Sequence, residues 1–175
     1  MIHDSERKDT LSLTNDTLNN TNSELVSDNL SIEGTYSYGN PSGQNTFGVL
    51  QIYSLNGNTS LFSLQLGLGS PSFNMGYEVG DMTSINSIGT YTMIDENYDI
   101  DCILNFEFFN KKVIVSTDKE HCNCGFGANV MADGTYWKTS QRKPKYYVNL
   151  ESDTFNFVDY FENELSGGED GEEEE

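Results

Sequence analysis

The sequence predicts an all-β protein, an antiparallel eight-stranded barrel with a β-sandwich as the alternative. Short runs of alternating apolar and polar residues recur about every ten residues between Gly, Pro and Asn turns, with no convincing helix between them. In addition, Gly34-Thr35-Tyr36 opens this region and Gly134-Thr135-Tyr136 closes it. Matching first and last strands are what a closed up-and-down barrel would pair, with glycine allowing the tight bend where strands meet.

The expected strands follow one another through residues 32–140. The third run, 61–68, alternates most regularly and places its apolar side chains on one face. The second and fourth runs also have one apolar face each, and Asn56-Gly57 is a type I′ hairpin signal. The eight expected strands are 32–38, 47–55, 61–68, 73–79, 89–94, 102–108, 113–117 and 134–140.

The two ends differ in composition from this domain. Residues 1–31 are rich in Asn, Ser, Thr and Asp and hold too few apolar side chains to offset ordering entropy, which predicts a disordered leader. Residues 141–166 predict a linker and a short amphipathic helix capped by Ser152, with Phe157, Val158, Phe161 and Leu165 on its apolar face. Residues 167–175 predict a disordered acidic tail.

The charge is strongly negative, with a formal net value of −19. This argues against nucleic acids and anionic membranes as partners, and it fits a basic protein partner or simple solubility. No apolar run reaches the length of a transmembrane helix, and the first residues lack the apolar segment of a signal peptide. We expect a monomer.

The three cysteines, Cys102, Cys122 and Cys124, lie in one short stretch. A disulfide between Cys102 and Cys124 would tie the segment before the last strand to the barrel wall; Cys102 with Cys122 is the alternative, because sequence does not fix connectivity. The three thiols and His121 could instead form a zinc site, but the Cys-x-Cys spacing lacks the usual two-residue spacer. We expect no metal and no cofactor.

Catalytic groups are scarce in this sequence. Its two histidines are His3, in the leader, and His121, beside the cysteines, so neither a His-based acid/base pair nor a triad is readily assembled. Asp133 fits a turn into the last strand. We expect no enzymatic activity.

The barrel interior raises a second question. An eight-stranded barrel holds either its own side chains or one small ligand. A ligand pocket would be lined by Phe62, Leu64, Leu66, Phe106, Phe108 and Tyr136, although the same residues would also fill a dry core.

A longer segment carries a family resemblance. The run from Cys124 to Tyr136, preceded by the Cys-x-Leu-x-Phe-x-Phe pattern of 102–108, resembles a segment at the end of small uncharacterised exported bacterial proteins of the cell envelope. The resemblance implies a periplasmic, cell-surface or secreted β-barrel and brings no activity with it; a cytoplasmic location is the alternative. Calycin-type barrels are similar in architecture, although Gly34-Thr35-Tyr36 replaces their usual Gly-x-Trp.

These observations favour a non-enzymatic binding or inhibitory module of the bacterial cell envelope or exterior. The acidic charge and the cysteine-pinned loop motivate this function. The alternative is a carrier of a small apolar ligand in the barrel interior.

Overall fold

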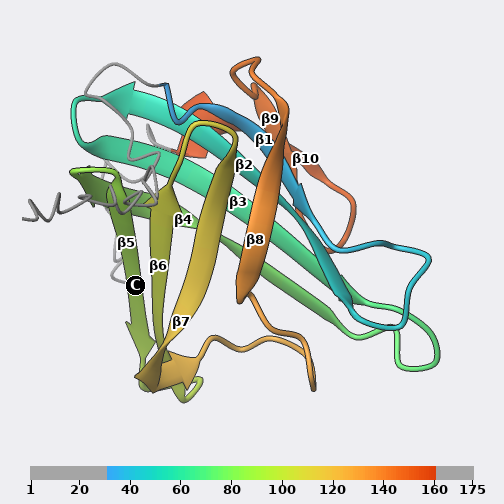
Figure 1. Cartoon of the computed structure of the whole chain (residues 1–175). Helices are drawn as coiled ribbons and strands as arrows, with labels where there is room; N and C mark the ends of the chain where they lie inside the picture. The colour runs from blue at the N-terminus through green and yellow to red at the C-terminus, as the bar shows by residue number, and fades with distance from the viewer. Residues whose placement is uncertain (1–30, 161–175) are drawn as a thin grey trace, which may run out of the picture.

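The computed structural model describes residues 31–160, and these form a closed antiparallel barrel of eight strands, as the sequence predicted (Figure 1). The predicted leader (all but residue 31), the predicted helix residues Phe161 and Leu165, and the predicted acidic tail 167–175 lie outside the described residues. The barrel strands are β1 Gly34–Tyr38, β2 Thr46–Asn56, β3 Thr59–Leu68, β4 Met75–Ile85, β5 Ile88–Asp95, β6 Ile100–Phe108, β7 Lys112–Asn123 and β8 Gly134–Ser140.

Each strand pairs with the next, and β1 closes the barrel against β8. Gly34 shows why the closure needs glycine. Its φ is 136°, and a Cβ atom there would lie 2.2 Å from the carbonyl oxygen of Ser140. A side chain at this position would push the two closing strands apart, so the glycine expected at the meeting point of the strands has a clear steric role.

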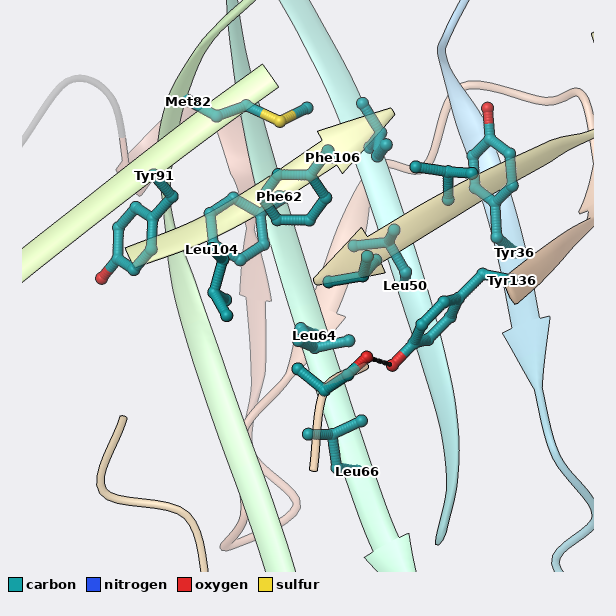
Figure 2. Packing of buried hydrophobic residues seen from close by; sticks show 14 of the residues in the cluster. Tyr36, Leu50, Phe62, Leu64, Leu66, Met82, Tyr91, Leu104, Phe106 and Tyr136 are labelled. Carbon is teal, nitrogen blue, oxygen red and sulfur yellow. Dashed lines mark hydrogen bonds between the residues drawn. The ribbon is translucent and has the colours of Figure 1, made fainter. Parts of the chain in front are cut away.

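The interior of the barrel is filled by one apolar cluster, part of which is shown in Figure 2. Aromatic rings meet across it: the Phe62 ring lies edge-on to Tyr91 with centroids 4.9 Å apart, and 5.1 Å from that of Phe106. The largest fully buried side chains of this cluster are Tyr36, Tyr136, Phe62, Phe106, Phe108, Leu50, Ile52, Leu64, Leu66 and Met82. Burying side chains of this size stabilises the barrel by about 1.5–3 kcal/mol each.

Strands β2 and β4 carry apolar side chains on both faces. The alternating apolar residues that stand out most in these two strands face outward. They include Phe47 and Tyr53 in β2 and Tyr77 and Val79 in β4. The interior instead receives Leu50 and Ile52 from β2, and Gly76, Glu78, Gly80 and Met82 from β4. A second layer must therefore cover the outer face of these strands.

That layer is a C-terminal hairpin of β9 Tyr146–Val148 and β10 Thr154–Asn156, seen in orange in Figure 1. Tyr147 and Phe157 pack with Leu61 of β3 in a separate apolar cluster. Two glutamines on the outer face of the barrel bind the backbone of β9. Gln51 donates to the carbonyl of Tyr146 (3.2 Å) and Gln65 to that of Val148.

The short C-terminal helix expected from the sequence is present, but it begins at Phe157 instead of following Ser152. Asn149 organises a turn in this region: its side-chain oxygen accepts hydrogen bonds from the backbone N–H of Glu151 and Asp153. Ser152 lies in this turn with a φ of 73°, so it cannot cap a helix there. Asn156 takes that place, accepting a hydrogen bond from the N–H of Val158.

Within residues 31–160, no helix combines the length and apolar character needed to cross a membrane.

Candidate functional site

The structure pairs Cys102 of β6 with Cys124, which follows β7, so the Cys102–Cys124 disulfide is the connectivity present. The Cα atoms of the two residues are 4.6 Å apart, and both side chains are buried. Cys122 is a free, exposed cysteine. The disulfide therefore fastens the start of the β7–β8 connection to the barrel wall.

We call residues 124–133 the mouth segment, because they run along one end of the barrel from β7 towards β8 (Figure 1). Val130 and Ala132 join the interior cluster. The Phe126 ring covers Gly76 of β4 so closely that a Cβ on Gly76 would lie 2.9 Å from it. The segment thus closes the barrel end with its own side chains.

The mouth segment is also bound to the β3–β4 connection on the far side of the barrel end. The N–H of Gly127 donates to the carbonyl of Met75 (2.9 Å), and the side-chain amide of Asn74 donates to the carbonyl of Ala128 (2.7 Å). Together with the disulfide, these bonds hold the segment from both sides. A segment held in this way presents its exposed residues at low entropic cost.

An apolar pocket of about 290 Å³ lies beside this connection, on the outer side of β2, β3 and β4. Phe73 and Met75 stand at it with 69% and 53% of their surface exposed. Phe73 also has a φ of 52°, a conformation that is costly for a bulky side chain. The rest of the lining comes mainly from Pro41, Phe47, Val49, Leu66 and Leu68. An exposed aromatic held in an unfavourable conformation is typical of a binding surface.

The same end of the barrel carries a group of carboxylates that we call the acidic rim. They stand around the β5–β6 turn and on the last part of β7, next to the mouth segment, because Asp101 pairs with Asn123 in register. The acidic rim consists of Asp95, Glu96, Asp99, Asp101, Asp118 and Glu120. The exposed ring of Tyr98 lies in the same turn.

The opposite end of the barrel is basic. It carries Lys111 and Lys112 in and beside the β6–β7 turn, and Arg142, Lys143 and Lys145 after β8. Lys143 forms an ion pair with Glu33 (2.9 Å). Lys119 interrupts the acidic rim and Glu107 stands near the basic end, so the separation of charge along the barrel is partial, with carboxylates predominating at the mouth.

His121 is an ionisable residue whose pKa responds to the acidic rim. Its Nδ1 lies 2.8 Å from a carboxylate oxygen of Asp101, and this hydrogen bond raises the pKa of His121 above its usual value. Asp118 accepts hydrogen bonds from the N–H groups of Glu120 and His121, which lower the pKa of its carboxyl group. Both contacts favour the charged forms of the two side chains, a protonated His121 and an ionised Asp118.

One acidic side chain inside the barrel was missed by sequence reasoning. Glu78 of β4 is 9% exposed and accepts a hydrogen bond from the hydroxyl of Tyr91 (2.8 Å), and burial raises the pKa of its carboxyl group. It lies where the barrel wall is least continuous, since β4 and β5 pair only through Thr83–Ile85 and Ile88–Thr90. The sequence does mark this face of β4, because every second residue of Gly76-x-Glu78-x-Gly80 is small or charged.

The six residues considered for an interior pocket lie together, in the packed interior. Phe62, Leu64, Leu66, Phe106, Phe108 and Tyr136 are each at most 2% exposed and belong to the same cluster. Leu66 is also the member of this set that lines the apolar pocket outside. The open space beside the barrel end is therefore formed largely by residues that the sequence did not single out.

Among residues 31–160, no group of three or more His, Cys, Asp or Glu side chains is arranged to hold a metal ion. Comparisons of the chain with protein-family models, with curated proteins and with solved structures found no match.

Proposed function

We propose that this protein is a non-enzymatic binding or inhibitory module that recognises a basic protein through the mouth end of its barrel. The observation that carries the proposal is the coincidence of three features at one end: a doubly held mouth segment, exposed apolar side chains and the acidic rim. The exposed side chains of Phe73, Met75 and Met131 offer apolar anchors, and the carboxylates offer charge complementarity to a basic surface.

The packed interior supports a surface function over carriage. A ligand inside the barrel would have to displace fully buried aromatic side chains such as Phe62 and Phe106. The apolar pocket outside, at about 290 Å³, is close to the lower limit of about 300 Å³ for small-molecule sites. It fits an apolar side chain of a protein partner better than it fits a carried ligand.

A location at the cell envelope or outside the cell belongs to the same proposal. The Cys102–Cys124 disulfide supports it, because disulfides persist in oxidising compartments and are rare in the cytosol. The resemblance of 124–136 to exported envelope proteins points the same way and remains a prediction.

The test uses the full chain immobilised on a sensor and a panel of basic hydrolases that includes lysozyme, with an acidic protein of similar size as the negative control. We expect at least one basic hydrolase to bind at about 25 mM salt and to bind more weakly at about 300 mM, because salt screens surface charges. Loss of hydrolase activity in the complex would show inhibition. Failure of every basic hydrolase to bind at low salt would contradict the proposal.

A pair of triple variants locates the contact. The mouth variant, Glu96→Gln with Asp99→Asn and Glu120→Gln, removes three exposed charges from the acidic rim. The matched control, Glu151→Gln with Asp153→Asn and Asp159→Asn, removes three from the C-terminal hairpin and helix. We expect the mouth variant to weaken binding about tenfold, at roughly 0.5 kcal/mol per exposed charge pair, and the control to leave it nearly unchanged. Equal losses of affinity in the two triple variants would show that binding depends on net charge and not on the acidic rim.

A further inference from the structure

Three sulfur atoms belong to two neighbouring strand ends at the mouth. In the antiparallel register Cys102 of β6 stands directly opposite Cys122 of β7, although its disulfide partner is Cys124. Directly opposed residues project their side chains from the same face, with Cα atoms about 4.5–5.5 Å apart. That spacing lies within the disulfide range of about 4.4–6.8 Å. The register of β6 and β7 shifts between Cys102 and Leu104, and beyond this bulge it places Cys122 next to Cys102 in addition to the bonded Cys124.

The exposure of the three residues differs in a way that favours exchange. Cys122 is exposed to solvent, whereas Cys102 and Cys124 are 0% and 6% exposed. The N–H of Cys124 also bonds to the carbonyl of Cys122 (3.2 Å), which keeps both cysteines in one tight turn. A soluble thiol has poor access to the buried disulfide, while a thiol held beside it in the same molecule reacts at a high effective concentration.

We propose that Cys122 exchanges with Cys124 as the disulfide partner of Cys102. The Cys122 thiolate attacks Sγ of Cys102, a bond forms between these two sulfurs, and the Cys102–Cys124 bond breaks with its electron pair leaving on Cys124. The Cys124 thiolate then takes a proton from water. One disulfide and one thiol are present before and after the step, so it needs no oxidant or reductant.

The exchange changes what the disulfide fastens. With Cys124 bonded, the bond anchors the first residue of the mouth segment; with Cys122 bonded, it joins β6 to β7 and leaves the segment without a covalent tether. Residues 124–129 would then be held mainly by the Phe126 ring on Gly76 and by the bonds from Gly127 and Asn74. The exchange would change how firmly the mouth segment is held, and so would bear on the binding surface of the proposed function. Its chemistry does not depend on any partner.

The wild-type chain provides the first test. Non-reduced protein is held without oxygen at pH 8.5 or at pH 5, quenched with acid and labelled briefly with a maleimide at pH 6.5. Tandem mass spectrometry that breaks the chain at Asn123 shows which cysteine carries the label. Because the thiolate is the nucleophile, we expect the Cys124-labelled fraction to rise at least tenfold after the pH 8.5 incubation. Label on Cys122 at both pH values would overturn the exchange.

Two variants test the alternative bond and its consequence. Cys124→Ser should form the Cys102–Cys122 disulfide, seen as a mass two hydrogens low, whereas the control Cys102→Ser should keep both thiols free. In oxidised Cys124→Ser, we expect amides of 125–129 to exchange hydrogen at least tenfold faster than in wild type, with the amides of β2 and β3 unchanged. Free thiols in Cys124→Ser would contradict the bond, and unchanged amides in 125–129 would contradict the loosening. The wild-type experiment remains decisive if a variant fails to fold.

Discussion

Tyr36 and Tyr136, on the two strands that close the barrel, make the same hydrogen bond to their own chain. Each hydroxyl donates to the carbonyl four residues earlier, Tyr36 to Ile32 (2.7 Å) and Tyr136 to Ala132 (2.8 Å), the latter drawn as a dashed line in Figure 2. Both rings are almost fully buried, and burial raises the pKa of both hydroxyl groups. The repeated Gly-Thr-Tyr thus encodes a repeated contact as well as a repeated strand.

We predict that Tyr136→Phe destabilises the protein more than Tyr36→Phe. Removing the hydroxyl leaves a carbonyl without its donor, which costs about 1–3 kcal/mol when the group is buried. The Tyr136 bond is buried, whereas the Tyr36 bond is only partly so. Urea unfolding monitored by fluorescence measures the two losses. Equal losses would contradict the difference in burial, and no loss in either variant would show that water replaces the hydroxyl at both sites.

Loss of the disulfide should destabilise the folded state. Cys102 and Cys124 are 22 residues apart, and the chain-entropy relation gives about 3 kcal/mol for a loop of this order. We expect the double variant Cys102→Ala with Cys124→Ala to lose about 2–4 kcal/mol of unfolding free energy in urea. Cys122→Ser is the matched control and should stay within about 0.5 kcal/mol of wild type, because its side chain is exposed. A similar loss in the control would contradict the assigned connectivity.

Glu78 should make stability fall as the pH rises above the ordinary glutamate range. Its pKa is raised in the folded state by burial, so above about pH 4.3 the folded chain holds a proton that the unfolded chain has released. The unfolding free energy therefore decreases from about pH 4.3 up to the raised pKa. Glu78→Gln keeps an acceptor for Tyr91 and should flatten this slope and stabilise the protein at pH 7. The same dependence of unfolding free energy on pH in Glu78→Gln and in wild type would show that Glu78 does not cause the slope.

His121 should titrate above its usual range because of Asp101. The raised pKa means that any stability from this contact is fully present below about pH 6.5 and is lost as the pH rises through the folded-state pKa. Proton NMR of the ring gives the pKa directly. We expect Asp101→Asn to lower it, and Asp118→Asn to lower it less, since the Asp101 hydrogen bond is the largest cause. A larger decrease of the His121 pKa in the Asp118 variant would contradict Asp101 as the main cause of the shift.

Phe73 should act as an apolar anchor for the partner of the proposed function. Phe73→Ala should weaken binding at least tenfold with little loss of stability, because the ring is largely exposed. Ile85→Ala is the control: it removes an exposed apolar side chain from the β4–β5 turn region at the opposite end of the barrel. A titration of the identified hydrolase against both variants measures the difference. Equal affinities would place the contact elsewhere.

The barrel and its closure could be predicted because alternation and the repeated Gly-Thr-Tyr report directly on strand geometry. Alternation shows that the two faces of a strand differ, but it does not show which face is inside when both are covered. The apolar face expected of the fourth run is therefore real, but its Tyr77 and Val79 meet the C-terminal hairpin outside the barrel. The interior of β4 went unrecognised because its glycines leave room for rings on other elements, as Gly80 does for Tyr91.

The C-terminal hairpin and the candidate site were harder to foresee. The hairpin depends on a local turn at Asn149 and on two glutamine side chains that donate to β9. The glutamine contacts join residues far apart in the chain, so no local pattern in the sequence announces them. The Cys102–Cys124 bond could be proposed because the two residues flank returning strands. The coincidence of Phe73, the mouth segment and the acidic rim arises only because the β3–β4, β5–β6 and β7–β8 connections meet at one end of the closed barrel.

Among residues 31–160, the carboxylates at the mouth and the basic side chains at the opposite end give the barrel an electric dipole along its length. If the proposed partner is a basic protein, its field would exert a torque on this dipole before contact and would turn the mouth forward. Oriented approach enlarges the share of collisions that are productive, so affinity would be gained through the association rate and would fade as salt shortens the reach of the field. The acidic rim would then act at a distance, before the partner covers the side chain of Phe73 or Met75.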